Sequence, residues 1–125
     1  MTALAGAVVA VAGAGGGAGP AVARRLAGAG ARVAVADADQ AKAARVADDV
    51  TSAGGLAESA EVDLLDLDAT RAWANGLLGR HGRVDGLVHL VGGWKGGTRL
   101  ADADLGEWDA LEPPLIRTVQ RTSQA

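Results

Sequence analysis

The stretch Ala12-Gly13-Ala14-Gly15-Gly16-Gly17-Ala18-Gly19 lies between an apolar run, residues 8–11, and a run that favours a helix, residues 20–29. Glycine permits a tight turn and lets other groups approach the backbone closely. The first N–H groups of the following helix would face an anion, with the positive end of the helix dipole behind them. A strand, a glycine turn and a helix in this order predict a site for the pyrophosphate of a dinucleotide.

Within this stretch, the pattern G-x-x-x-G-x-G is carried by Gly13, Gly17 and Gly19. The predicted phosphate-binding loop is completed by Gly15, Gly16 and Ala18. A glycine motif alone is weak evidence, and the chain is rich in Ala and Gly throughout. The alternative is therefore a flexible connector without a ligand.

Composition limits the class of protein. A chain of 125 residues is the size of one domain, residues 1–125. The net charge of −3 and the lack of a basic block argue against a nucleic-acid partner. The sequence has no cysteine and only His81 and His89 as histidines, so we expect no metal site. The uncharged residues 1–23 lack a basic start and contain helix-breaking Gly and Pro20, so we expect a cytoplasmic protein without a membrane partner.

The alternation of apolar and amphipathic runs predicts an α/β fold. Strands are expected over residues 5–12, 31–36, 56–62 and 84–91, and helices over residues 20–29, 40–53, 68–80, 105–111 and 115–123. Pro113-Pro114 should break or sharply kink the last helix. We expect a Rossmann-like, doubly wound parallel sheet of about four strands in the order 3-2-1-4, with helices on both faces.

Asp37 ends the second predicted strand, near the spacing of about 20 residues expected after the first glycine of a dinucleotide motif. Its carboxylate can accept hydrogen bonds from a ribose 2′-hydroxyl and would repel a 2′-phosphate. Residues 38–40 bring no positive charge, so the sequence favours NAD over NADP. The alternative is that Asp37 caps the next helix, although Asp39 suits that role equally well.

These residues together resemble the N-terminal half of the short-chain dehydrogenase/reductase family. The glycine loop matches the family motif, with Ala12 where Thr is usual, and residues 82–88 and 104–118 resemble the fourth strand and the helix after it. The resemblance implies that Asp63 accepts from the adenine amino group and that Leu64 packs on the ring. The cofactor-binding residues it implies are Gly13, Gly15, Gly16, Gly17, Ala18, Gly19, Asp37, Asp63, Leu64, Val91 and Gly92.

Two departures concern the chemistry. The family's Asn-Asn-Ala-Gly reads His89-Leu90-Val91-Gly92 here, so His89 is either a packed core histidine or a functional residue. The family also uses a Ser and a Tyr-x-x-x-Lys, in which the Tyr passes a proton to or from the substrate oxygen. The chain contains no Tyr, so we expect no catalytic residue and interpret it as truncated before that segment.

Three interpretations follow. The chain is the cofactor half of an oxidoreductase that transfers hydride between NAD and an alcohol or carbonyl compound, a non-catalytic NAD-binding or interaction module, or a degenerate remnant. The apolar strand 84–91 would lie at an open edge of the sheet. Such an edge predicts association with a second copy or with a complementary C-terminal fragment. Trp94 and Lys95, in the loop after that strand, either flank the pocket or are simply exposed.

Overall fold

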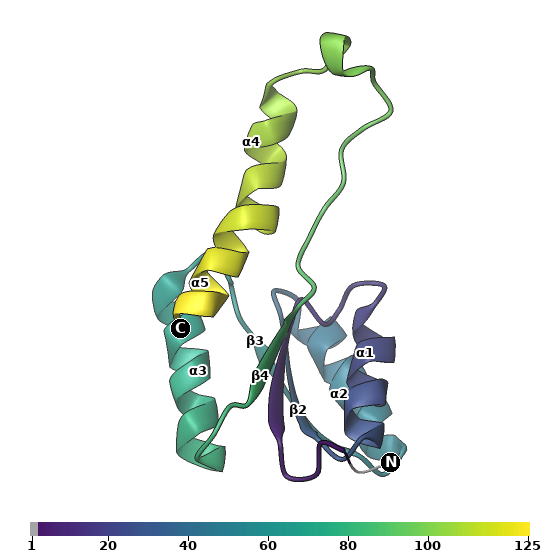
Figure 1. Cartoon of the computed structure of the whole chain (residues 1–125), viewed down its shortest axis with the longest axis vertical. Helices are drawn as coiled ribbons and strands as arrows, with labels where there is room; N and C mark the ends of the chain where they lie inside the picture. Colours follow the sequence, from purple (N-terminus) through teal and green to yellow (C-terminus); the bar gives the residue numbers. More distant parts are fainter. Residues whose placement is uncertain (1–2) are drawn as a thin grey trace.

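The computed structural model describes residues 3–125 and contains a four-stranded parallel sheet in the order β3-β2-β1-β4 (Figure 1). The elements are β1 Val8–Ala12, α1 Gly19–Gly28, β2 Arg32–Asp37, α2 Gln40–Ser52, β3 Leu56–Glu61, α3 Leu67–His81, β4 Gly86–His89, a 3-10 turn Leu100–Asp102, α4 Gly106–Glu112, a π-helical segment Pro113–Arg117 and α5 Thr118–Gln124. The predicted fold class and strand order are confirmed.

The two central strands are apolar along their length because helices cover both faces of the sheet. On one face, Val11 and Val35 pack against residues of α1 and α2, among them Ala23 and Val46. On the other face, Ala10 and Ala34 pack against α3. β3, with its alternating polar residues, lies at one edge as expected.

β4 is shorter than the predicted strand 84–91. At its start, the Asp85 carboxylate accepts a hydrogen bond from the Val8 N–H at 2.8 Å, while the Asp85 N–H donates to the Val8 carbonyl. At its end, the Leu90 N–H donates to the carbonyl of Ala12, the last residue of β1. Beyond that point β4 has no neighbouring strand to pair with, so the chain leaves the sheet.

The C-terminal helix does not break at Pro113-Pro114, so that part of the prediction was wrong. The α4, π-helical and α5 segments form one continuous rod that projects beyond the sheet (Figure 1). The Thr118 N–H donates to the Pro113 carbonyl five residues earlier, as in a π-helix. A proline has no N–H to donate and clashes with the preceding turn, and the wider π turn accommodates both effects.

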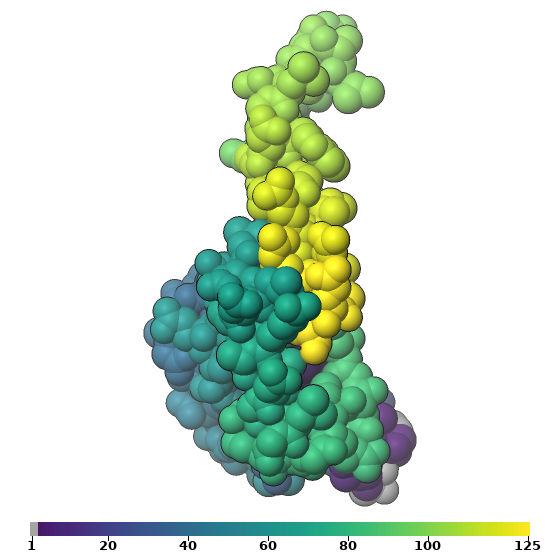
Figure 2. Space-filling view, turned by 90° about the vertical axis from the view of Figure 1, so that its left-hand side faces the viewer, coloured from purple at the N-terminus to yellow at the C-terminus, as the bar shows by residue number. Residues whose placement is uncertain are grey.

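α5 lies against α3, while α4 and the loop before it extend away from the body (Figure 2). No helix within residues 3–125 has the length and apolar character needed to cross a membrane.

Candidate functional site

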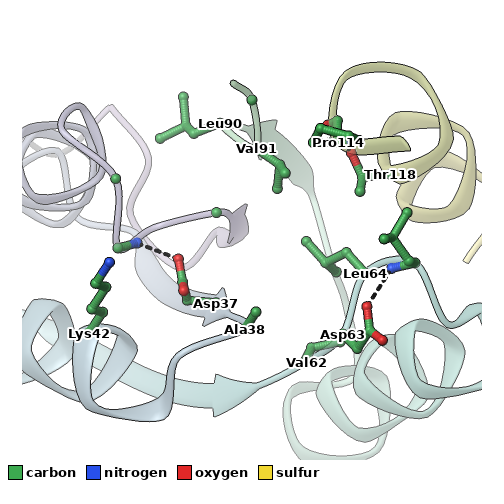
Figure 3. Close-up of a pocket in the computed structure, with 15 residues that line it drawn as sticks. Asp37, Ala38, Lys42, Val62, Asp63, Leu64, Leu90, Val91, Pro114 and Thr118 are labelled. Carbon is green, nitrogen blue, oxygen red and sulfur yellow. Dashed lines mark hydrogen bonds between the residues drawn. The ribbon is translucent and has the colours of Figure 1, made fainter. Parts of the chain in front are cut away.

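A cavity of about 320 Å³ opens at the carboxyl ends of β1, β2 and β4 (Figure 3). In the order β3-β2-β1-β4, this is where the chain switches from one side of β1 to the other. Open parallel sheets bind ligands at such a switch point. The lining residues are Gly13, Gly15, Gly16, Asp37, Ala38, Lys42, Val62, Asp63, Leu64, Leu65, Leu90, Val91, Gly92, Pro114 and Thr118.

The glycine loop joins β1 to α1, and three of its glycines are required by close contacts. Gly13 has a φ of 79°, and a Cβ there would lie 2.6 Å from the Val91 nitrogen. A Cβ on Gly15 would lie 2.7 Å from an oxygen of Asp37. At Gly19 it would lie only 1.6 Å from the Ala14 carbonyl oxygen. The loop is therefore a tightly fitted turn and not a flexible connector.

Gly17 differs from these positions, because a Cβ there would meet nothing within 4 Å. Within residues 3–125, the N–H groups of Gly17 and Ala18 have no hydrogen-bond acceptor. Ala18 is the N-cap of α1 and provides no side-chain cap. The amino end of α1 therefore presents free N–H groups and the positive end of its dipole, which together suit an anion.

Asp37 ends β2 and faces the glycine loop. Its Oδ2 accepts a hydrogen bond from the Gly15 N–H at 2.9 Å, and its Oδ1 accepts one from the Asp39 N–H at 2.9 Å. The N-cap of α2 is Asp39, which accepts from the N–H groups of residues 41 and 42. Asp37 therefore does not cap the helix. Each of its oxygens keeps a second lone pair for a ligand hydroxyl.

Lys42 was not predicted to lie at the site. It lies beyond residues 38–40, the neighbours of Asp37 along the chain, but the first turn of α2 brings it back beside the glycine loop. A Cβ on Gly15 would lie 2.7 Å from the Lys42 Cβ. The signal in the sequence was its place in the first turn of a helix that begins just after Asp37.

Asp63 and Leu64 follow β3 and both line the cavity. The exposed Asp63 accepts a hydrogen bond from the Leu65 N–H at 3.0 Å. Leu64 is buried and packs with Ala12 and Ala36 in the core. Much of the Leu64 side chain thus serves the fold as well as the cavity wall.

The remaining wall comes from distant segments of the chain. Leu90, Val91 and Gly92 follow β4, and Pro114 and Thr118 come from the C-terminal helix (Figure 3). The resemblance implied Val91 and Gly92 but not the helix residues. Contacts of this kind depend on how the helix docks on the sheet, and this docking cannot be predicted from the spacing of residues along the chain.

Most of the predicted site residues meet in this cavity, namely Gly13, Gly15, Gly16, Asp37, Asp63, Leu64, Val91 and Gly92. Three do not line it, namely Gly17, Ala18 and Gly19. Gly17 and Ala18 are exposed at the amino end of α1, while Gly19 is buried under the turn. The unpredicted lining residues are Ala38, Lys42, Val62, Leu65, Leu90, Pro114 and Thr118.

The other residues considered from the sequence lie outside the cavity. Trp94 is 80% exposed, and Lys95 is exposed beside it. His89 is half-buried and hydrogen-bonded to α5, and its burial lowers the pKa of the ring below the usual value. Among residues 3–125 there is no group of three or more His, Cys, Asp or Glu side chains arranged to hold a metal ion.

A doubly wound parallel sheet with a fitted glycine turn at its switch point defines a dinucleotide-binding type of fold. Residues 7–113 match the family model of the short chain dehydrogenases. The chain belongs to this family, as its sequence pattern indicated.

Solved structures agree with this assignment. A metagenomic short-chain oxidoreductase in complex with NADP is 39% identical, with a TM-score of 0.86 over 98% of this chain and 56% of its own. A short-chain dehydrogenase/reductase from Burkholderia xenovorans is 30% identical, with a TM-score of 0.89 over 99% of this chain and 51% of its own. A hydroxysteroid dehydrogenase from Escherichia coli is 30% identical, with a TM-score of 0.83 over 97% of this chain and 51% of its own.

The chain thus spans about half the length of these structures. The comparison with curated proteins gave no match.

Proposed function

We propose that the cavity binds a nicotinamide dinucleotide. The chain would be the cofactor-binding part of an oxidoreductase that transfers hydride between this cofactor and an alcohol or carbonyl compound. The observation that carries the proposal is the Asp37 carboxylate, which faces the glycine turn within one cavity at the switch point. A structure 39% identical to this chain is a complex with NADP, which supports this class of cofactor.

The cavity offers different chemistry for each part of a dinucleotide. The pyrophosphate would lie against the free N–H groups of Gly17 and Ala18 at the amino end of α1. Asp37 would accept hydrogen bonds from the adenosine ribose. Asp63 and Leu64 would contact the adenine, and Val91 and Gly92 would lie along the path toward the nicotinamide.

We propose further that NAD is preferred over NADP. The Asp37 carboxylate is fixed by two backbone N–H groups and would stand next to a 2′-phosphate, which it repels. Lys42 opposes this preference, because its ammonium group is the one positive charge that residues 3–125 contribute to the cavity wall. Asp37 decides the balance in this proposal because it is held in place, whereas Lys42 is exposed on a flexible side chain.

Calorimetric titration of the chain with NAD and with NADP tests both proposals. We expect binding of both, with NAD tighter by at least about tenfold, a difference of about 1.4 kcal/mol. Tighter binding of NADP would overturn the preference for NAD. The absence of binding by either cofactor would overturn the proposed function.

The chain alone is not expected to turn over substrate. The sequence has no Tyr, and the titratable groups on the cavity wall are Asp37, Lys42 and Asp63. None of these reproduces a phenol with a neighbouring lysine at the nicotinamide end. Sustained NADH formation from NAD and a panel of alcohols would contradict this expectation, while binding without turnover also fits a non-catalytic NAD-binding module.

We also propose that copies of the chain associate through the edge of β4. β4 pairs only with β1 among the described strands, and Leu87 at its centre is 40% exposed. An apolar strand with a free edge is a template for pairing with another strand. A complementary C-terminal fragment would occupy the same edge and compete with self-association.

A further inference from the structure

His89 joins the end of β4 to the C-terminal helix through both of its ring nitrogens. Nε2 lies 3.0 Å from the Thr118 hydroxyl, and Nδ1 lies 3.2 Å from the Thr122 hydroxyl. The two threonines are 3% and 9% exposed, so these contacts are shielded from water. His89 thereby links the end of β4 to one face of α5 through two hydrogen bonds.

The proton positions in this cluster follow from the other bonds of the threonines. The Thr118 hydroxyl donates to the Pro114 carbonyl at 2.6 Å, so toward His89 it can only accept. Nε2 must therefore carry the hydrogen. In a neutral ring Nδ1 is then an acceptor. The single hydroxyl proton of Thr122 has two acceptors within reach, Nδ1 at 3.2 Å and the Thr118 carbonyl at 2.9 Å, and with a neutral ring it is the donor to Nδ1. This satisfies both nitrogens with His89 uncharged.

The same contacts reach the candidate cofactor site. Thr118 and Pro114 are the two residues through which the C-terminal helix lines the cavity. Thr118 also lies directly after the π-helical segment, and its hydroxyl bonds to the proline carbonyl in that segment. Whatever fixes Thr118 against β4 also fixes this wall of the cavity.

We propose that His89 is a positioning residue, which latches α5 to β4 and so holds Pro114 and Thr118 in the wall of the dinucleotide cavity. The link to cofactor affinity rests on the proposed function, whereas the latch itself does not. His89 takes no part in this cavity directly, because it is not among the residues that line it.

The surroundings of His89 favour its neutral form. Burial lowers the pKa of the ring, so protonation on acidification opposes the packed arrangement. The charged residue on α5 is Arg121, whose buried Nε has no hydrogen-bond partner in the described part of the chain, residues 3–125. Arg117, just before α5, is paired with Glu112. The paired strand β1 has no charged residue, and α3 packs Thr70, Trp73 and Leu77 inward while its Asp68 and Arg71 are exposed. Asp63 belongs to the wall of the cavity that follows β3, and its carboxylate accepts a hydrogen bond from the Leu65 N–H.

The test compares wild type, His89→Leu, His89→Gln and His81→Gln at pH 7.5 and 5.5. His89→Leu removes both bonds. The Thr118 hydroxyl keeps its bond to the Pro114 carbonyl, and the Thr122 hydroxyl can turn to the Thr118 carbonyl, so folding should persist. Glutamine keeps a donor and an acceptor without titrating in this range. His81→Gln is the matched control, because His81 binds Glu58 and lies outside the cavity. Two measurements are made: amide hydrogen exchange of residues 118–124, and affinity for NAD.

We expect His89→Leu to reduce both the protection of residues 118–124 and the NAD affinity by about fivefold, the value of about one hydrogen bond. In wild type and His81→Gln, the protection of residues 118–124 and the NAD affinity should both be lower at pH 5.5 than at pH 7.5. In His89→Gln, both should change little between these two pH values. Wild-type protection in His89→Leu would overturn the latch. Lost protection with unchanged affinity would overturn the positioning role. If wild type binds no NAD, the proposed function fails, and hydrogen exchange alone still decides the latch.

Discussion

Two glycines of the loop, only two positions apart, should respond in opposite ways to the same added methyl group. In Gly19→Ala, the new Cβ would lie 1.6 Å from the Ala14 oxygen and 2.4 Å from its carbonyl carbon. These are backbone atoms of a tight turn, so no side-chain rotation can relieve the clash. Overpacking usually costs about 1–3 kcal/mol, and we expect a loss of about 3 kcal/mol or more here.

Gly17→Ala is the matched variant. A Cβ at Gly17 meets nothing within 4 Å, and its φ lies outside the left-handed region. The free energy of unfolding should therefore stay constant or rise by about 0.4–1 kcal/mol, because the unfolded chain loses freedom. The affinity for NAD should fall at least about tenfold, since the methyl group would occupy the approach of the pyrophosphate to the free N–H groups.

Urea unfolding, followed by circular dichroism, gives the stability of each variant, and calorimetric titration with NAD gives the affinity. A Gly19→Ala protein within about 0.5 kcal/mol of wild type would show that the turn is not fitted as described. A Gly17→Ala protein that binds NAD as wild type does would refute the placement of the pyrophosphate at the amino end of α1.

Three further changes test other parts of the molecule. Asp37→Ser should raise the ratio of NADP affinity to NAD affinity at least about tenfold, because the fixed negative charge is removed. An unchanged ratio in calorimetric titrations with both cofactors would count against Asp37 as the ribose contact. Partial burial raises the pKa of Glu58, but hydrogen bonds from Arg80 and His81 lower it more, so the net pKa lies below its usual 4.5. The ionised Glu58 therefore stabilises the folded state above pH 4.5, and this stabilisation is lost as the pH falls through the lowered pKa. Glu58→Gln should therefore reduce the loss of unfolding free energy below about pH 4.5. The reduction should be about 0.2–1 kcal/mol, because the ion pair is partly exposed. If the unfolding free energy of the variant fell as steeply with acidification as that of wild type, this prediction would be contradicted. Leu87→Lys should weaken concentration-dependent association in size-exclusion chromatography, and a wild-type protein that stays monomeric at all concentrations would argue against pairing at β4.

Much of the fold could be predicted because its rules are local. The buried central strands are continuous apolar runs, the polar alternation of β3 indicated an edge, and the acidic residue that ends β2 occupied its expected place. The sequence does not decide between Asp37 and Asp39 as the cap of α2, because both have suitable side chains within the same turn. The structure gives the cap to Asp39 and turns Asp37 toward Gly15.

Other features depended on groups that are close in space but distant along the chain. The proline pair was expected to break the last helix, yet a single π turn absorbs both residues. Thr118 and Pro114 reach the cavity only because the helix docks beside β4, where His89 meets it. No periodicity or motif in the sequence predicts where this helix docks.

The sequence by itself determined the parallel sheet, its strand order and the position of the glycine turn, since apolar periodicity and backbone freedom are properties of short segments. Tertiary structure decided which glycines are held by contact, that Lys42 lies beside Asp37 at the glycine loop, and that a helix from the C-terminal part of the chain lines the cavity. The physical reason is that these features arise from side chains brought together by packing, whose distances are not encoded in the spacing of any one segment.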